Sequence, residues 1–153
     1  FFKAKLGDFV LTGPDAGSAG MTTQLAEMSK SPFVVLEKKR LTPDEVESHG
    51  TRNLIDEKLL KKHFVIVDDI SSTGGTLLAT IDQLKEYGVK RISCFVFHNL
   101  VRDTNVLKAF RQRKVNFFFS NSLPREGYTV DIIDDVAQAV RAKNGDIRNI
   151  ERG

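Results

Sequence analysis

The sequence predicts an α/β domain with a mostly parallel sheet and helices on both faces. Short runs of β-branched and aromatic residues, such as residues 64–67 (FVIV), show no polar alternation, which is typical of strands buried on both sides of a parallel sheet. Segments with apolar residues at helical spacing lie between these runs. Strands and helices therefore alternate along one domain covering residues 1–153.

The first half of the chain contains two predicted strands and one helix before the central motif. A strand at 9–11 leads into a glycine-rich turn, and a helix is predicted at 21–28. A second buried strand is predicted at 33–36 and is followed by Glu37, Lys38, Lys39 and Arg40. Residues 41–60 are polar and contain Pro43 and Gly50, so we predict a flexible lid at about 38–60.

The second half repeats the alternation. The strand at 64–67 is followed by a helix with Leu77, Leu78, Ile81 and Leu84 on one face and Gly88 as its stop. Further strands are predicted at 91–97, 115–119 and 128–132, and helices at 104–114 and 136–142. Asp134 and Asp135 suit the first turn of the last helix, because acids complement its dipole. The polar tail at 144–153 is expected to be frayed.

Composition excludes several function classes. The net charge of +3 is too small to predict nucleic-acid binding, and no apolar stretch is long enough to span a membrane. Cys94 is the single cysteine, so a reducing, cytoplasmic location is expected. The chain begins at Phe1 without a signal-peptide pattern, and we expect it to be part of a longer protein.

The central motif follows the strand at 64–67 and predicts a phosphate cradle. Asp68 and Asp69 come first, and a loop of small residues leads into the helix: Ser72, Thr73, Gly74, Gly75 and Thr76. The glycines let backbone N–H groups turn inward, the hydroxyl groups add donors, and the helix N-terminus favours an anion. The two carboxylates would repel a phosphate unless they face ribose hydroxyls or a bridging Mg²⁺ ion. The alternative is an ordinary strand–helix turn with a capping serine or threonine.

Two other segments carry candidate ligand contacts. Asp15 and Gly17 lie in the turn after the strand at 9–11, where Asp15 could hold Mg²⁺ and the glycine N–H groups could face a pyrophosphate. A plain turn explains this segment equally well. Lys38 and Arg40 belong to a cluster of three cations at the end of the strand at 33–36, and such a cluster is usually a solvated rim.

The segment VDDISSTGGTL resembles the phosphoribosyl pyrophosphate motif of type I phosphoribosyltransferase-like proteins. Within that group, the rest of the chain is most similar to the C-terminal domain of the ribose-phosphate diphosphokinase family, and STGGT is similar to its archaeal branch. GPDAG at 13–17, the Lys38 and Arg40 pair, and Ser120-Asn121-Ser122 occur in the family's order. The resemblance covers residues 7–141 and departs at Met21, where the family usually has an arginine.

The resemblance implies transfer of the β,γ-diphosphate of MgATP to the C1 hydroxyl of ribose 5-phosphate. By this likeness the loop at 72–76 holds the 5-phosphate, and Asp68 and Asp69 hold ribose hydroxyls directly or through Mg²⁺. Asp15 supports MgATP, Gly17 lies against ATP or its pyrophosphate, and Lys38 with Arg40 is catalytic. Partners implied are ATP, ribose 5-phosphate and further copies of the chain in a homo-oligomer.

Two alternatives stay open. The first is a phosphoribosyltransferase that consumes phosphoribosyl pyrophosphate and uses the same sugar cradle under a different lid. The second is a non-catalytic regulatory homologue, favoured by Met21 at the usual arginine position and opposed by the retained Lys38 and Arg40.

Overall fold

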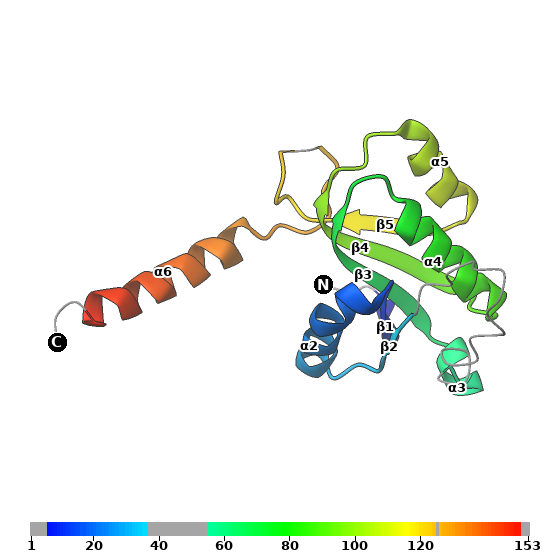
Figure 1. Cartoon of the computed structure of the whole chain (residues 1–153), viewed down its shortest axis with the longest axis horizontal. Helices are drawn as coiled ribbons and strands as arrows, with labels where there is room; N and C mark the ends of the chain where they lie inside the picture. Colours follow the sequence, from blue (N-terminus) through cyan, green and yellow to red (C-terminus); the bar gives the residue numbers. More distant parts are fainter. Residues whose placement is uncertain (1–5, 37–54, 125, 151–153) are drawn as a thin grey trace, which may run out of the picture.

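One parallel sheet organises the protein. The computed structural model describes residues 6–36, 55–124 and 126–150, with 142–150 as backbone only. Five strands lie in the order β2-β1-β3-β4-β5, and each neighbouring pair is parallel (Figure 1). The strands are β1 (Phe9–Gly13), β2 (Phe33–Val35), β3 (His63–Ser71), β4 (Arg91–Asn99) and β5 (Asn116–Phe119). The predicted type I phosphoribosyltransferase-like sheet is confirmed.

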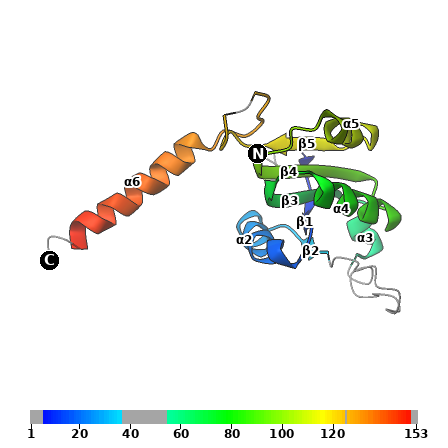
Figure 2. The same cartoon turned by 45° about the horizontal axis from the view of Figure 1, so that its top comes forward.

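Helices cover both faces of this sheet, as predicted. Helices α4 (Gly75–Glu86) and α5 (Thr104–Gln112) pack on one face, and α2 (Ala19–Ser29) packs on the other (Figures 1 and 2). The other helices of the described chain are the short 3-10 helix η1 (Ala16–Ser18), the short helix α3 (Glu57–Leu60) and the longer helix α6 (Ile133–Ile150). No helix of the described chain is both long and apolar enough to cross a membrane.

The central strand β3 contributes side chains to two cores. Phe64 and Ile66 point into the core under α4 and α5, while Val65 and Val67 point into the core under α2. All four side chains are fully buried. A strand covered on both faces cannot alternate apolar and polar residues, which is why this run is continuously apolar.

Several strand boundaries differ from the predicted ones. β3 extends through Asp68 and Asp69 to Ser71, so the acidic pair lies within the strand, and Asp68 pairs with Val96 of β4. β2 is an edge strand, and Phe33 is 44% exposed, so this segment is not buried throughout. In the predicted lid, residues 57–60 form α3, and residues 37–54 lie outside the described residues.

The predicted strand at 128–132 is wrong. Only a single bridge, Ser120 to Val130, joins this segment to the sheet. Side chains compete for its backbone: Ile132 N–H donates to Asn121 Oδ1 at 2.9 Å, and Ile133 N–H donates to Asp131 Oδ1 at 3.0 Å. Such side-chain bonds replace ladder bonds and end the strand.

The expectation of a frayed tail is also wrong for residues 144–150, which continue α6 to Ile150. Asp134 and Asp135 occupy its first turn, as predicted. Three alanines lie within the helix, and alanine has the highest helix propensity. That preference outweighs Asn144 and Gly145, the residues that suggested fraying.

Candidate functional site

The order of the strands defines where a ligand can bind. From β1 the chain crosses to β2 on one side, and from β3 it crosses to β4 on the other side. The loops after β1 and β3 therefore diverge at the carboxyl edge of adjacent strands, and this switch point is where open α/β sheets bind ligands. The structure brings together here the two loops singled out in the sequence.

The loop after β3 has the geometry of an anion cradle. Gly74 adopts a left-handed conformation, with φ +75°, and precedes α4 without any side-chain cap. The carbonyl oxygen of Gly74 accepts the first helical bond from Leu78 N–H at 3.0 Å. Gly75 N–H donates to Thr73 Oγ1 at 3.4 Å, and the N-cap residue Gly74 offers no side chain to the other N–H groups of the first turn, which lie at a positive dipole end. Ser72, Thr73 and Gly75 are exposed beside them, and Thr76 is half-buried.

The acidic pair lies at the carboxyl end of β3. Asp68 is partly buried, whereas Asp69 is exposed. Asp69 N–H donates to Asp68 Oδ1 at 3.1 Å, and Ile70 N–H donates to Asp69 Oδ1 at 2.7 Å, so the backbone orients both carboxylates. Burial, followed by the negative charge of Asp69 and, more weakly, that of Asp15, raises the pKa of Asp68 to about 6.

Asp15 reaches this pair from the loop after β1. Its charge acts on Asp68 although the two residues are far apart in the sequence. Asp15 also caps η1: its Oδ1 accepts from Ser18 N–H at 3.2 Å, and Ser18 Oγ donates to its carbonyl oxygen at 2.6 Å. The cap fixes the direction of the carboxylate, and Gly17 stays exposed in the same turn.

These carboxylates suit a divalent cation that also binds a phosphorylated ligand. Within the described ranges, no group of three histidine, cysteine or acidic side chains converges closely enough to form a protein-only metal cage. Mg²⁺ ordinarily binds through one or two carboxylates together with substrate phosphates. The mutual repulsion that raises the pKa of Asp68 would be relieved by such a cation, so the donor set fits Mg²⁺.

Three other predicted positions have different outcomes. Lys38 and Arg40 lie outside the described residues. Met21 lies on α2 and packs partly buried against the core formed with Phe9 and Leu11, so an apolar residue fits this position. The side chain at 21 therefore serves packing between α2 and the sheet.

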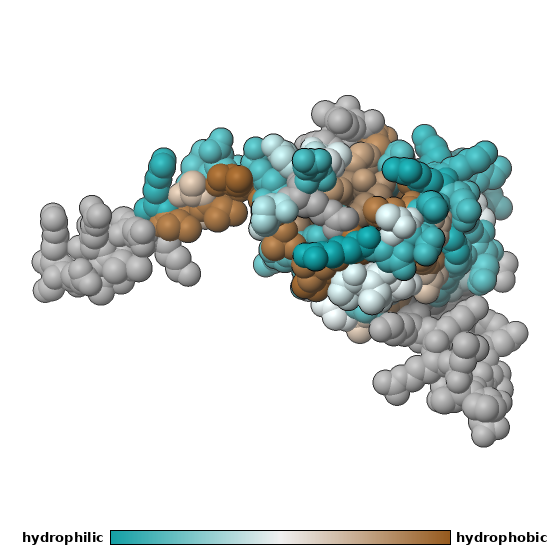
Figure 3. All heavy atoms as spheres, turned by 90° about the horizontal axis from the view of Figure 1, so that it is seen from above, coloured by the Kyte–Doolittle hydropathy of each residue, from teal (hydrophilic) through white to brown (hydrophobic). Residues whose placement is uncertain are grey.

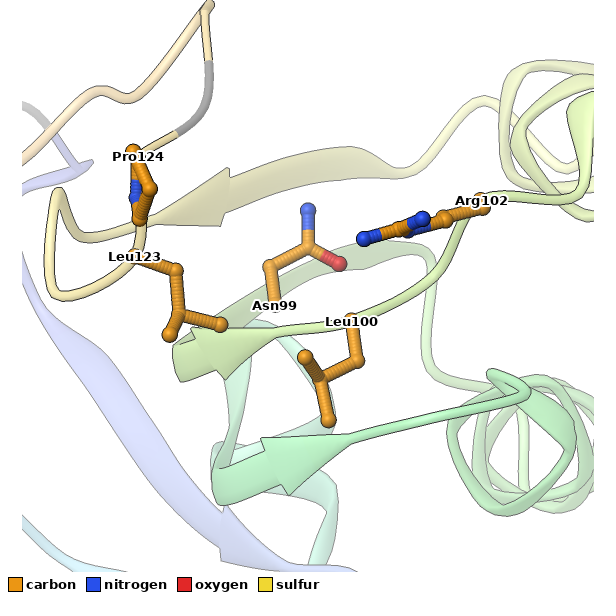
Figure 4. Close-up of a pocket in the computed structure, with 5 residues that line it drawn as sticks. All are labelled: Asn99, Leu100, Arg102, Leu123 and Pro124. Atoms are coloured by element: carbon orange, nitrogen blue, oxygen red, sulfur yellow. The ribbon is translucent and has the colours of Figure 1, made fainter.

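A pocket of about 480 Å³ lies at the same edge of the sheet, beyond the cradle. Its lining residues lie at the end of β4 and in the segments after β4 and β5, and they are Asn99, Leu100, Arg102, Leu123 and Pro124 (Figure 4). Asn99 pairs in register with Ser71, the last residue of β3, so the pocket adjoins the loop at 72–76. Sequence reasoning missed Arg102, because a single arginine after a strand has no distinguishing pattern.

The two walls of this pocket are joined by hydrogen bonds. His98 Nδ1 lies 2.9 Å from Ser122 Oγ, and Ser122 Oγ donates to Phe97 O at 2.6 Å. Ser120 Oγ donates to the same carbonyl oxygen at 2.7 Å. These contacts hold the turn after β5 against the end of β4.

Comparison with known proteins agrees with this geometry. Residues 2–124 match the phosphoribosyl transferase domain family. The ribose-phosphate pyrophosphokinase of Pyrococcus abyssi is 30% identical over 141 residues, which cover 90% of this chain and 47% of the relative. The ribose-phosphate pyrophosphokinase 2 of Saccharomyces cerevisiae is 28% identical over 145 residues, covering 91% of this chain and 44% of the relative. The chain thus spans about half the length of the curated relatives that it matches.

Solved structures share the fold. Phosphoribosylpyrophosphate synthetase from Mycobacterium smegmatis superposes with a TM-score of 0.67 at 20% identity, covering 94% of this chain and 47% of that one. Orotate phosphoribosyltransferase from Aeropyrum pernix superposes with a TM-score of 0.54 at 16% identity, covering 74% of this chain and 59% of that one. At these identities the likeness concerns architecture alone.

Proposed function

Because this chain belongs to the phosphoribosyl transferase domain family, we propose that it carries the sugar-phosphate site of a ribose-phosphate diphosphokinase. In this reaction the C1 hydroxyl oxygen of ribose 5-phosphate attacks the β-phosphorus of MgATP. The bond between the α,β-bridging oxygen and the β-phosphorus breaks, AMP leaves, and the C1 hydroxyl loses its proton. The products are phosphoribosyl pyrophosphate, AMP and a proton.

One juxtaposition carries the proposal. The start of α4, whose N-cap residue is a glycine, lies at the same edge of the sheet as the acidic end of β3 and as Asp15 in the loop after β1. A ligand with a terminal phosphate and vicinal hydroxyl groups satisfies both: the phosphate meets the N–H groups, and the hydroxyl groups meet the carboxylates. The names of the relatives supply the diphosphokinase reaction.

The proposed roles follow the chemistry of each group. The loop residues Ser72, Thr73, Gly74, Gly75 and Thr76 bind the 5-phosphate. Asp68 and Asp69 accept hydrogen bonds from ribose hydroxyls and fix the position of C1. Asp15 and Gly17 contact the MgATP side, and Lys38 with Arg40 stabilises negative charge on the transferring group. Holding both substrates in line lowers the entropic part of the barrier.

Asp15, Asp68 and Asp69 are the residues that would hold Mg²⁺. When bound, this ion would neutralise phosphate charge and polarise the transferring group. The chain's own contribution is orientation, since backbone N–H groups direct the Asp68 and Asp69 carboxylates. Self-association and a cytoplasmic location belong to the same proposal as expectations from the sequence.

A coupled assay tests the activity directly. The chain is incubated with Mg²⁺, ATP and ribose 5-phosphate, and AMP and phosphoribosyl pyrophosphate are detected. Calorimetry measures ribose 5-phosphate binding by the same preparation. Product formation supports the diphosphokinase. Binding without product indicates that the residues contributed by the other half of the relatives are needed, and absence of binding contradicts the site.

A matched pair of variants locates the sugar site. Asp69→Ala is expected to abolish ribose 5-phosphate binding with little change in the thermal midpoint, because the Asp69 side chain is exposed. Asp134→Ala removes the same exposed group from α6 and should leave binding unchanged. An unaltered dissociation constant for Asp69→Ala would contradict the assignment of the acidic pair.

The pocket behind the cradle favours a second candidate function. A phosphoribosyltransferase needs a site for an acceptor next to the sugar, and the pocket lined by Asn99 and Arg102 adjoins the phosphate loop (Figure 4). Its amide, guanidinium and leucine side chains suit a small polar ring. Incubation with phosphoribosyl pyrophosphate and individual nucleobases distinguishes the two reactions, since only the transferase would release pyrophosphate.

A further inference from the structure

The chain after β4 is fastened to the start of the loop at 72–76. Asn99, the last residue of β4, pairs in register with Ser71, the last residue of β3. Leu100 N–H donates to the carbonyl oxygen of Ser71 at 2.9 Å. Because Ser71 directly precedes the loop, these contacts fix where the segment after β4 lies relative to it.

The side chain of Asn99 shapes the turn that follows β4. Figure 4 shows Asn99 at the point where the chain leaves the strand. Its Oδ1 accepts a hydrogen bond from Val101 N–H at 3.1 Å, and the residue is only 4% exposed. Such a bond to the N–H group two residues later forms an Asx turn, which fixes the local backbone.

The side chain of Val101 lies against the loop at 72–76. Val101 is 1% exposed, yet it belongs to neither of the two described cores. A Cβ added to Gly74 would lie 3.6 Å from Val101 Cγ2, which is ordinary van der Waals distance. The same position is 2.6 Å from Val106 Cγ1 and 3.7 Å from Phe110 Cε2. Three apolar side chains therefore surround Gly74.

Val101 differs from the other apolar residues that lie outside the cores. Ile133, Val136 and Val140 of α6 are 60%, 52% and 54% exposed and form an apolar surface on that helix (Figure 3). Leu100, the neighbour of Val101, is 41% exposed. The turn at Asn99 thus leaves Leu100 at the surface and buries Val101 beside Gly74.

Gly74 does not determine its own conformation. Glycine adopts positive and negative φ about equally readily, so its φ of +75° must be selected by its surroundings. This φ sets the direction in which the backbone enters α4, and with it the positions of the first N–H groups of the helix. The contacts around Gly74 consequently determine whether these N–H groups are placed for an anion.

We propose that Asn99 is a positioning residue. Through its Asx turn it holds Val101 against Gly74 and keeps the loop at 72–76 in the conformation that binds a phosphate group. This role rests on the proposed function, in which the loop binds the 5-phosphate of ribose 5-phosphate. Asn99 acts through Val101 and needs no contact with the ligand. A preformed loop binds more tightly because it loses less conformational entropy on binding.

Two measurements test this role, well below the thermal midpoint of each variant. Calorimetry measures ribose 5-phosphate affinity, and NMR relaxation measures the backbone order parameters of residues 72–76 without ligand. Asn99→Ala should lower the affinity about tenfold, as expected if the binding conformation falls to about a tenth of the population. The order parameters should fall from about 0.85 to about 0.6. Asn99→Ser should partly restore both quantities, because a serine hydroxyl can accept the same bond from Val101 N–H.

A matched pair of valine variants separates positioning from general stability. Val101→Ala removes the contact with Gly74. Val115→Ala removes the same atoms from a residue that is 7% exposed, belongs to the core under α4 and α5, and precedes β5 at the opposite edge of the sheet. Both variants should lose similar stability in urea. Only Val101→Ala should weaken binding and loosen the loop.

The outcomes distinguish this role from the proposed function. Order parameters that stay unchanged in Asn99→Ala would overturn the proposal, because a residue that merely contacts the ligand leaves the free loop rigid. Equal effects of Val101→Ala and Val115→Ala on the loop would overturn it as well. If the wild type does not bind ribose 5-phosphate, the proposed function fails, and the order parameters still decide whether Asn99 positions the loop.

Discussion

The carboxyl group of Asp68 should make the stability of the ligand-free protein depend on pH in an unusual direction. Burial at the end of β3 is the largest cause of its raised pKa, and the charges of Asp69 and Asp15 add to it. The Asp69 N–H opposes the shift by donating to the ionised carboxylate. We therefore expect Asp68→Asn, which keeps the shape and removes the charge, to stabilise the fold above neutral pH.

The magnitude follows from the pKa values. The pKa of Asp68 rises from an ordinary 3.8 to about 6 in the folded protein. At about 1.4 kcal/mol per pKa unit, the raised pKa of Asp68 lowers the free energy of unfolding by at most about 3 kcal/mol. Asp68 is only half-buried, so solvent screening reduces the expected effect to about 1 kcal/mol. For a chain of this length, that difference raises the thermal midpoint by about 2–4 °C.

The sign follows from proton binding. Between about pH 4 and pH 6 the folded carboxyl keeps its proton while the unfolded one loses it, so stability falls as pH rises through this window. Above about pH 6 the protein has lost the full amount of stability, and below about pH 4 it has lost none. The gain from Asp68→Asn should therefore appear at alkaline pH and vanish in acid.

Thermal unfolding at both ends of this window, without Mg²⁺ or substrates, measures the effect. Asp82→Asn is the matched control of opposite sign. Arg113 donates to both Asp82 oxygens at 2.8 Å and lowers the pKa of that carboxyl. Asp82→Asn should consequently destabilise the protein at neutral pH and less so in acid. An Asp68→Asn midpoint that is lower at alkaline pH, or raised equally at both pH values, would refute the reasoning.

Two further variants probe the cradle and the cationic pair. Gly74→Ala should destabilise the fold by about 1–3 kcal/mol in urea titrations, because φ is +75° and an added Cβ would lie 2.6 Å from Val106 Cγ1. Gly75→Ala is its control, since a Cβ there would lie 3.5 Å from Thr73 Oγ1, at ordinary contact distance. If the diphosphokinase is active, Lys38→Ala should lower kcat with little change in ribose 5-phosphate affinity; a change in KM alone would count against a transition-state role.

Continuous apolar runs made the inner strands predictable. Phe64, Ile66 and Val67 are buried, as expected of a strand with helices on both faces, and the same reasoning located β1 and β4. The order of the strands could not be read from such runs, because spacing along the chain does not record which strands are neighbours. The mixed polar and apolar residues near 128–132 have the pattern of a strand. In the structure, the side chains of Asn121 and Asp131 accept hydrogen bonds from the backbone N–H groups there, so these groups do not bond to a neighbouring strand.

The candidate site was predictable in composition and less so in arrangement. The loop at 72–76 and the acidic pair were identified because several residue types with complementary chemistry are adjacent in sequence. The approach of Asp15 to Asp68 depends on β1 and β3 being neighbours, which only the fold establishes. Arg113 gives another example: it follows α5 and forms an ion pair with Asp82 of α4, a contact between residues far apart in the sequence that no local pattern indicates.

The raised pKa of Asp68 connects the stability of the fold to its proposed use. Burial of Asp68, together with the negative charges of Asp69 and Asp15, favours the neutral form of its carboxyl group. A residue chosen for stability alone would be neutral at this position, as Asp68→Asn tests. The loss of stability caused by the charged Asp68 is offset when a bound cation supplies positive charge or when a ligand donates hydroxyl hydrogen bonds to the carboxylates. Asp68→Asn should thus yield a protein that is more stable and binds ribose 5-phosphate less well, a trade-off typical of functional sites.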